Sequence, residues 1–234
     1  GAHTYSRGDA QFPSNAPPIL SRGKGAYVWD PEGNKFLDYG MGLRAVTLGY
    51  ADEEVNKAAK KSMDDGVNLT RASAIELQAA ELLVDLIPSA EMVKFAKNGS
   101  TVTTAAVKLA RAYTGRNRIA FCADHPFFSY DDWFIGSVVM DRGIPPEIKN
   151  LSLQFQYNDI TSLEKLFSEY PDQIAAVMLE PCTNEPPQNN FLLRVQELCA
   201  KQKTVFILDE MITGFRWHLQ GAQTLFNVLP DLTT

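Results

Sequence analysis

The sequence predicts an α/β fold in which a mostly parallel sheet is flanked by helices. Between residues 118 and 208, short apolar runs alternate with stretches of helical periodicity. Several runs, such as residues 174–179, are apolar on both sides, which is typical of parallel strands that helices cover on both faces. The chain has 234 residues, 45% of them hydrophobic, so it is long enough to build a large core.

A β-hairpin and two helices are expected before this sheet. The β-prone runs 26–30 and 35–39 are separated by Pro-Glu-Gly-Asn at residues 31–34, which favours a tight turn. Apolar residues then recur at helical spacing over residues 52–63 and 74–87, with charged residues on the opposite side. Two amphipathic helices should therefore follow the hairpin.

The remaining elements alternate along the chain. Short apolar runs predict strands at residues 92–96, 118–122, 151–155, 174–179 and 204–208. Helical periodicity predicts helices at residues 102–113, 161–170 and 191–201. The last residues, 230–234, have the composition of a turn, with no strand or helix to close the sheet, so we expect an incomplete domain.

The composition disfavours several kinds of partner. The formal net charge is −6, and Lys and Arg are scattered along the chain, which disfavours nucleic acid and anionic membranes. Residues 1–18 are polar, with no apolar run for a signal peptide or a membrane span. The three cysteines form no CxxC pair, which is typical of a reducing compartment. We therefore expect a cytoplasmic protein with a small-molecule substrate and no metal site.

Asp209 directly follows the predicted strand 204–208, at the edge of a parallel sheet where ligands gather. Taken alone, such an acid is more often a structural cap or a Mg²⁺ ligand than the partner of a cationic cofactor atom. The stretch 208–216, Leu-Asp-Glu-Met-Ile-Thr-Gly-Phe-Arg, resembles the strand-end signature of class III aminotransferases, in particular the glutamate-1-semialdehyde 2,1-aminomutase group. The resemblance implies that Asp209 pairs with the pyridinium nitrogen of pyridoxal 5'-phosphate. It also implies that Met211 packs on the ring, with ordinary core packing as the alternative.

A second motif, Lys-Asn-Gly-Ser-Thr at residues 97–101, leads into the predicted helix at residues 102–113. A short Gly-Ser turn before a helix offers free N–H groups to a phosphate, although most such turns are simply helix caps. Residues 98–116 resemble the phosphate-binding turn and helix of the family. The resemblance therefore implies that Gly99 and Ser100 bind the cofactor phosphate. Thr101 stands where the family normally has Glu, and we include it among the cofactor-binding residues.

The segment 121–134 falls where the family places a Tyr-His-Gly whose aromatic ring stacks on the cofactor. Asp124 stands in the position of that tyrosine, and the segment is a few residues longer. The ring-stacking residue therefore remains open among His125, Phe127 and Phe128, with His125 and Phe127 preferred. Ordinary packing is the alternative for both phenylalanines.

Two further residues are assigned by the resemblance. Residues 179–186, Leu-Glu-Pro-Cys-Thr-Asn-Glu-Pro, resemble the Glu-Pro motif of the family, which implies that Glu185 lies near the phenolic oxygen of the cofactor. A Glu there favours an aminotransferase over an aminomutase, although Asn184 allows a shift of one residue. Arg44 is a candidate for binding a substrate carboxylate, and a solvent-facing or interface arginine is the alternative.

The resemblance covers nearly the whole chain but only about half of a complete family member. It implies the fold type I of pyridoxal-phosphate-dependent transferases, with residues 1–50 as part of the small domain and residues 51–234 as the large cofactor-binding domain. The Schiff-base lysine is expected about three positions beyond Thr234, so the chain alone should be inactive. Full-length relatives are homodimers. The alternatives are a non-catalytic fragment that binds the cofactor or dimerises, and a nucleotide-binding domain, for which no G-x-G-x-x-G or Walker motif is present.

Overall fold

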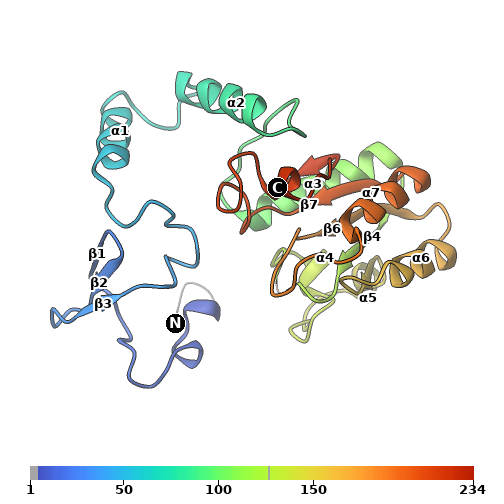
Figure 1. The fold of residues 1–234 in the computed structure, drawn as a ribbon, viewed down its shortest axis with the longest axis horizontal. Coiled ribbons are helices and arrows are strands. Elements are labelled where there is room, and N and C mark those ends of the chain that lie inside the picture. The colour runs from blue at the N-terminus through green and yellow to red at the C-terminus, as the bar shows by residue number, and fades with distance from the viewer. Residues whose placement is uncertain (1–4, 126) are drawn as a thin grey trace. The chain divides into compact units, whose positions relative to one another are not determined.

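The computed structural model describes residues 5–125 and 127–234 (Figure 1). Pro126, within the predicted ring-stacking segment, and the first four residues lie outside the described part. The chain divides into two compact units, an N-terminal unit up to Ala72 and a C-terminal unit from Ser73 to Thr234. This division by contacts falls after the first helix, and the assignment of residues 51–234 to a single domain stays a prediction.

The N-terminal unit contains a small antiparallel sheet in the order β1-β2-β3. The predicted hairpin is present, because Gly33 adopts a φ of 89° and Asp30 Oδ1 accepts the N–H of Asn34 at 2.8 Å. The first strand was not expected. The elements of this unit are η1 (Tyr5–Arg7), η2 (Asp9–Gln11), β1 (Arg22–Lys24), β2 (Tyr27–Trp29), β3 (Lys35–Leu37) and α1 (Glu53–Asp64).

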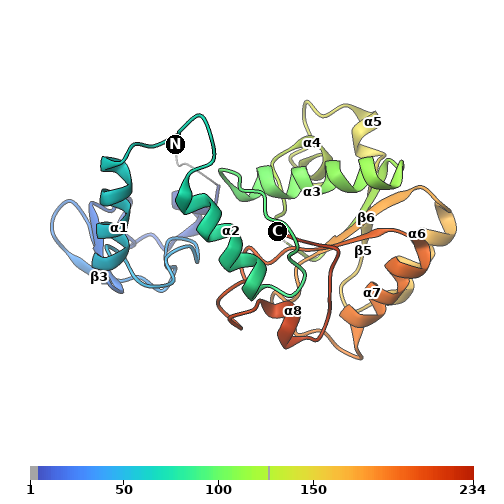
Figure 2. The same ribbon diagram turned by 90° about the horizontal axis from the view of Figure 1, so that it is seen from above.

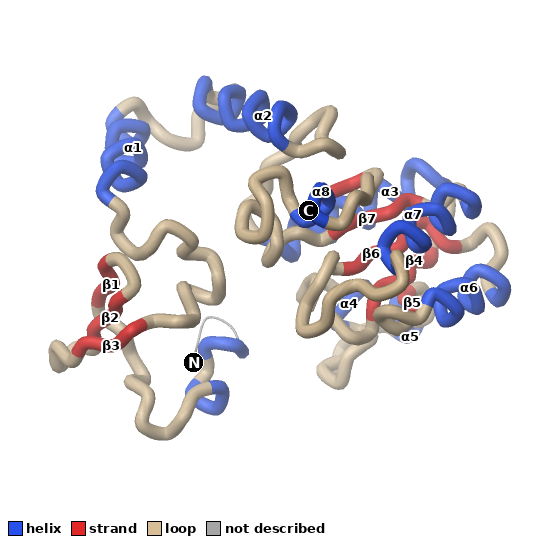
Figure 3. The backbone as a smooth tube through the Cα atoms, in the orientation of Figure 1, coloured by secondary structure: helices blue, strands red, loops and turns tan. Residues whose placement is uncertain are grey.

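The C-terminal unit is built on a five-stranded sheet in the order β5-β4-β6-β7-β8, and every pair in it is parallel. Figure 3 shows four of these strands, β4, β5, β6 and β7, in red. This confirms the predicted fold class. The strands are β4 (Arg118–Cys122), β5 (Ser152–Phe155), β6 (Ile174–Leu179), β7 (Val205–Leu208) and β8 (Leu232–Thr233).

Helices cover both faces of this sheet (Figure 2). The long helix α3 and the short helix α4 pack on one face, and α6 and α7 pack on the other. Among the described residues, no helix is both long and apolar enough to cross a bilayer. The helices of this unit are α2 (Ala74–Leu86), α3 (Gly99–Thr114), α4 (Asp132–Ile135), α5 (Pro146–Lys149), α6 (Ile160–Glu169), α7 (Phe191–Gln202) and α8 (Ala222–Leu225).

The central strand β6 shows why apolar and polar residues do not alternate along the predicted strands. All six of its residues are buried. Ala176 and Met178 belong to the core cluster under α3, whereas Val177 and Leu179 belong to the cluster under α6 and α7. Successive side chains point to opposite faces of a strand, so a sheet covered on both faces needs apolar residues at every position.

Two sequence predictions are wrong. Residues 92–96 form no strand, and Met92 is largely exposed, so this short apolar run has no neighbouring strand to pair with. Residues 230–234 do contain a strand, because β8 pairs with β7 through Ile207 and Leu232. The Asp231 carboxylate accepts the N–H of Phe206 at 2.8 Å and fixes the start of β8, a long-range contact that the turn-like composition conceals.

Candidate cofactor site

Two of the predicted cofactor residues, His125 and Asp209, lie just beyond the carboxyl ends of strands. His125 follows β4 by three residues, Glu180 directly follows β6, and Asp209 directly follows β7. The amide of Asp209 donates to the Leu179 carbonyl at 2.9 Å, and the amide of Glu180 donates to His125 Nδ1 at 2.9 Å. Because β6 lies between β4 and β7, His125 and Asp209 flank the end of β6.

Asp209 is buried, with 3% of its surface exposed. Its Oδ1 accepts the N–H of Met211 at 2.9 Å, which fixes the orientation of the carboxyl group. Burial raises the pKa of Asp209 to about 7; the neighbouring Glu210 adds to the shift and the Met211 amide opposes it. A carboxyl group whose pKa lies near 7 is easily ionised when a cationic atom binds beside it.

The first turn of α3 offers free N–H donors. Asn98 caps this helix, and its side-chain oxygen accepts the N–H of Thr101 at 3.0 Å. The amides of Gly99 and Ser100 have no hydrogen-bond partner among the described residues. Two unpaired donors at the positive end of a helix dipole form an anion-binding position. Thr101 is exposed, and both its amide and its hydroxyl bond to Asn98, so it contributes less to this position than Gly99 and Ser100.

The Ser100 hydroxyl can also donate a hydrogen bond to an anion at this position. Its Oγ accepts the N–H of Tyr130 at 3.3 Å, so its own proton remains available to an anion. The segment that carries Tyr130 is joined to α3 by further bonds, among them Thr103 Oγ1 to the Phe128 carbonyl at 2.9 Å and Thr104 Oγ1 to Asp131 Oδ2 at 2.5 Å. Hydrogen bonds therefore join the segment after β4 to the first turns of α3.

Met211 connects the end of β7 to this turn. A Cβ atom at Gly99 would lie 2.7 Å from Met211 Sδ, so a larger residue here would require the flexible thioether to move. Met211 is partly exposed, with 36% of its surface accessible. The side chain predicted to pack on the cofactor ring and the turn predicted to hold its phosphate are thus in direct contact.

The three candidates for ring stacking differ in exposure. Phe128 is buried in the core under α3, and His125 is 4% exposed and contacts the ring of Tyr157 at 5.2 Å between centroids. Phe127 is 50% exposed, and its ring makes an edge contact with Phe134 at 5.7 Å between centroids. Phe127 therefore has the most open ring of the three. His125 instead presents a buried Nε2 with no hydrogen-bond partner among the described residues.

Glu185 and Arg44 are less closely defined. Glu185 lies on an exposed turn after β6, where its carbonyl accepts the Cys182 thiol at 3.0 Å, and Asn184 is exposed beside it. Arg44 belongs to the N-terminal unit, in a turn where Leu43 and Arg44 adopt positive φ angles. The roles assigned to Glu185 and Arg44 stay predictions.

Sequence reasoning missed two residues that organise the site. The Tyr157 hydroxyl donates to the Pro181 carbonyl at 2.7 Å, which joins the segment after β5 to the turn after β6. The buried Glu210 carboxylate accepts the amides of Ala222 at 2.6 Å and Gln223 at 3.0 Å. The only local signal was position, since both residues lie just beyond the carboxyl end of a strand.

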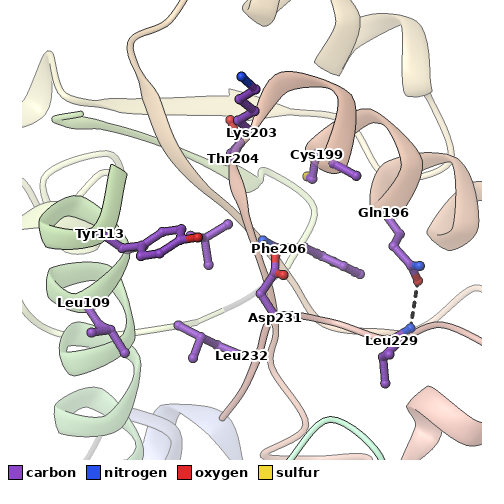
Figure 4. A pocket seen from close by; sticks show the side chains of 13 residues that line it. Leu109, Tyr113, Gln196, Cys199, Lys203, Thr204, Phe206, Leu229, Asp231 and Leu232 are labelled. Carbon is purple, nitrogen blue, oxygen red and sulfur yellow. Dashed lines mark hydrogen bonds between the residues drawn. The ribbon is translucent and has the colours of Figure 1, made fainter. Parts of the chain in front are cut away.

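A cavity of about 620 Å³ lies away from these residues (Figure 4). Leu109 and Tyr113 of α3, Cys199 of α7 and Phe206 of β7 contribute to its wall. It contains none of the predicted cofactor residues and reaches the start of β7, whereas Asp209 follows the end of that strand. Its wall is mostly apolar, and Lys203 and Asp231 are among its polar members.

The residues at the carboxyl edge fit pyridoxal phosphate. The free amides of Gly99 and Ser100 suit its phosphate, and the buried Asp209 carboxyl suits its ring nitrogen. The unpartnered Nε2 of His125 and the partly exposed Met211 leave polar and apolar contacts for the ring.

Comparison with known sequences agrees with this fit. Residues 10–234 match the profile of the family described as Aminotransferase class-III. The glutamate-1-semialdehyde 2,1-aminomutases of Aquifex aeolicus and Acetivibrio thermocellus are 37% and 36% identical to this chain over 229 and 230 residues. The matches cover 93% of this chain and 54% of each relative, so the chain spans about half the length of the curated relatives it matches.

Solved structures show the same fold. An omega-transaminase from Sphaerobacter thermophilus superposes with a TM-score of 0.87 at 31% identity, covering 95% of this chain and 55% of that one. The FumI protein of Sphingopyxis sp. MTA144, in its pyridoxal phosphate internal aldimine form, gives a TM-score of 0.89 at 28% identity, covering 100% and 56%. The predicted fold type and cofactor are thereby confirmed. With the free amides at the start of α3, the buried acid after β7 and the profile match in agreement, this chain belongs to the class III aminotransferases, a family that depends on pyridoxal phosphate.

Proposed function

We propose that this protein transfers amino groups with pyridoxal phosphate, as an aminotransferase or an aminomutase similar to glutamate-1-semialdehyde 2,1-aminomutase. The observation that carries the proposal is the pairing of a buried carboxyl at the end of β7 with free amides at the start of α3. The contact between Met211 and Gly99 joins these two features into one site. The lysine that relatives use to hold the cofactor covalently is proposed to lie beyond Thr234.

Each side chain of the site has a separate task in this proposal. Bound pyridoxal phosphate supplies an electron sink for the electrons released from the substrate Cα–H bond. Asp209 holds a proton on the ring nitrogen by ionising opposite it. Gly99 and Ser100 bind the phosphate, and Phe127 and Met211 orient the ring.

The choice between the two reactions rests on Glu185. A glutamate at this position favours an aminotransferase, and Asn184 is the neighbour that a shift of one residue would bring into its place. Arg44 is proposed to bind the carboxylate of the amino donor or acceptor through its planar guanidinium.

A homodimer in the cytoplasm is the proposed state of the protein. Helix α2 has no buried residue, and it exposes Ile75, Leu77 and Leu82 on more than one side. An apolar helix of this kind needs cover, which a second copy can supply. Cys122, Cys182 and Cys199 are buried free thiols, which suits a reducing compartment.

A non-catalytic role for this chain is the second candidate. The two lysines nearest to β7 in sequence, Lys201 and Lys203, precede the strand, whereas Asp209 follows its other end. A four-residue strand spans roughly 13 Å, so neither lysine lies beside Asp209. By itself the chain would then bind pyridoxal phosphate without a covalent link, or contribute only to dimerisation.

The test is to mix the purified chain with pyridoxal 5'-phosphate, record the visible spectrum, reduce with borohydride and measure the intact mass. We expect a noncovalent complex with no stoichiometric reduced adduct. Absence of any binding would overturn the cofactor site, and one stoichiometric adduct would show that a lysine within these 234 residues serves as the covalent partner.

A matched pair of variants tests the phosphate position. Ser100→Ala removes the buried hydroxyl at the start of α3 and should weaken binding of pyridoxal phosphate roughly tenfold. Ser168→Ala, whose hydroxyl bonds to the Glu164 carbonyl on α6, should bind as the parent chain does. Equal affinities of the two variants would contradict the assignment of Ser100.

A further inference from the structure

The sequence contains a single Asn-Gly pair, Asn98-Gly99, and this pair stands at the start of α3. Asn98 is exposed, and it is the residue that caps the helix. The amide of Gly99 has no hydrogen-bond partner among the described residues. The pair therefore combines an accessible side-chain amide with a free backbone nitrogen directly after it.

An asparagine that precedes a glycine can lose its side-chain amide without any enzyme. The backbone nitrogen of the following residue attacks the side-chain carbonyl carbon and closes a cyclic imide. Glycine is the most permissive following residue, because it has no side chain to obstruct ring closure and its backbone rotates freely. A nitrogen whose N–H is already donated to another group is a poorer nucleophile, so a free amide favours the reaction.

Other pairs in the chain lack this combination. Asp65-Gly66 can close the same imide, but the Gly66 amide donates to the Met63 carbonyl at 3.1 Å. Every other asparagine is followed by a residue with a side chain, which hinders ring closure. Loss of a side-chain amide is therefore favoured at Asn98 over the other asparagines.

The helix cap restrains this reaction without preventing it. Asn98 Oδ1 accepts the amide of Thr101 at 3.0 Å and the Thr101 hydroxyl at 3.2 Å. The ψ angle of Asn98 is 168°, and attack requires rotation about this bond so that the Gly99 nitrogen faces the side-chain carbonyl. Both restraints are released when the first turn frays. Helix ends fray far more readily than helix interiors, so ring closure can occur in the folded protein.

We propose that Asn98 is a deamidation site, which the empty protein modifies by itself and a bound phosphate group protects. The Gly99 nitrogen loses its proton to water and forms a bond to Cγ of Asn98, and the bond from Cγ to the side-chain nitrogen breaks with release of ammonia. Water then opens the imide at either carbonyl, which leaves an aspartate or an isoaspartate at position 98. No oxidation or reduction takes place, and water is the only co-reactant.

The protective effect rests on the proposed function, which places a phosphate on the amides of Gly99 and Ser100. A phosphate oxygen that accepts the N–H of Gly99 occupies the nucleophile and stabilises the closed turn. After deamidation, the new carboxylate lies beside these amides and repels a phosphate dianion. Aspartate caps a helix as well as asparagine does, so the change should lower the affinity for phosphate and leave folding intact.

Ageing the purified chain in a mildly alkaline buffer tests the site. Trypsin releases residues 98–108 as one peptide, because Lys97 and Lys108 bound it. Mass spectrometry should show the acid form of this peptide accumulating faster than that of peptides with the other asparagines. A position 98 that keeps its amide while other asparagines lose theirs would overturn the proposal.

Two small molecules that differ only in a phosphate test the protection. Pyridoxamine 5'-phosphate and pyridoxamine both lack the aldehyde that would label lysines. At about ten times its dissociation constant, pyridoxamine 5'-phosphate should slow deamidation at Asn98 roughly tenfold, because it binds the closed turn. Pyridoxamine at the same concentration should leave the rate unchanged. Equal rates with the two compounds would overturn protection by the phosphate.

Two variants of the capping residue separate charge from capping. Asn98→Asp carries the charge of the product, whereas Asn98→Ser keeps a neutral cap that cannot form the imide. We expect pyridoxamine 5'-phosphate to bind the Asp variant roughly tenfold more weakly than the Ser variant. The affinity of the Ser variant should stay constant during ageing, while that of the parent falls. Equal affinities of the two variants would overturn the effect of the new charge, and circular dichroism establishes that both are folded.

The two proposals fail in different ways. If pyridoxamine 5'-phosphate does not bind the parent chain, the phosphate position of the proposed function fails and protection fails with it. The rate in the empty chain then still decides whether Asn98 is the modified residue. If the compound binds and the rate at Asn98 does not change, protection alone is overturned and the proposed function stands.

Discussion

Asp209 and His125 lie on either side of the end of β6, and burial shifts their pKa values in opposite directions. The pKa of Asp209 rises from 3.8 to about 7, so the folded state holds a proton that the unfolded state releases. Its contribution to stability is full below pH 3.8 and is lost as the pH rises to about 7. The pKa of His125 falls from 6.5 to about 4, so its contribution is full above pH 6.5 and is lost as the pH falls to about 4.

The two groups should therefore nearly cancel between pH 6.5 and 4, and single variants should reveal each of them. In Asp209→Asn only the His125 effect remains, so acidification should destabilise this variant relative to the parent by on the order of 3 kcal/mol. In His125→Asn only the Asp209 effect remains, so acidification should stabilise it relative to the parent by a similar amount. Urea unfolding at pH 6.5 and 4.5 measures both changes. The same sign in both variants would contradict the pKa shifts.

Gly99 offers a second test at the scale of single residues. Gly99→Ala would place a methyl group 2.7 Å from Met211 Sδ, and the flexible thioether would have to move. We expect the free energy of unfolding to change by less than about 1 kcal/mol, because Ala is well tolerated in a helix. Binding of pyridoxal phosphate should weaken roughly tenfold, since both the turn and Met211 are disturbed.

The double variant Gly99→Ala/Met211→Ala is the control for this test. It removes the clash but also the thioether. Affinity that recovers in the double variant would show that the clash was the cause, and affinity that falls further would show that Met211 itself contacts the cofactor. No loss of affinity in the single variant would argue against a site at this turn.

At the scale of elements, Glu210 connects β7, β8 and α8. Its amide donates to the Thr234 carbonyl at 2.8 Å, and its carboxylate accepts from Ala222, Gln223 and Thr213. Gly221 leaves room for this carboxylate, because a Cβ there would lie 2.5 Å from Glu210 Oε1. The loop from β7 to α8 is therefore ordered around one buried acid.

Replacing this acid should destabilise the C-terminal unit. In Glu210→Gln one carboxylate oxygen becomes an NH₂ group that faces backbone donors, so we expect a loss of about 2–4 kcal/mol in the free energy of unfolding. Glu197→Gln, an exposed substitution on α7, should change it by no more than about 0.5 kcal/mol. Equal values for the two variants in urea unfolding would show that the carboxylate is not needed.

At the scale of the whole molecule, the long elements and the hairpin could be predicted, whereas two short strands could not. Strands β4 and β6 begin and end where the apolar runs do, because burial on both faces leaves a continuous pattern. Strands β1 and β8 have three and two residues, too few to show a period. Their existence depends on partners elsewhere in the chain, which a local pattern does not contain.

The candidate site shows the same division. Gly99, Ser100 and Asp209 could be proposed from the sequence because strand ends and helix starts have local signatures, and the family motifs reinforced them. The contacts of Tyr157 and Glu210 were missed, since they join residues 24 and 12 positions apart through the register of the sheet. The burial of His125 likewise follows from Tyr157, which arrives from the neighbouring edge strand β5.

The division into two units predicts where a protease acts first. Residues 65–72, between α1 and α2, are exposed and outside regular structure. Trypsin should therefore cleave after Arg71 before it cuts within the sheet, and intact mass should identify a fragment that begins at Ala72. Arg71→Gln should remove this early product. Early cuts between β4 and β7 in the parent chain would contradict the division.

The pairing of β8 has a consequence for engineering. The amide of Thr234 donates to the Leu208 carbonyl at 3.1 Å, and the Thr234 carbonyl accepts the amide of Glu210. Both backbone polar groups of Thr234 are therefore held by hydrogen bonds to the segment at the end of β7. A polypeptide joined at this point would start from a defined position beside Asp209. The same register makes Thr234 a suitable junction for a split enzyme, in which this chain and a separately expressed second half of a relative are reassembled by ligation or by inteins.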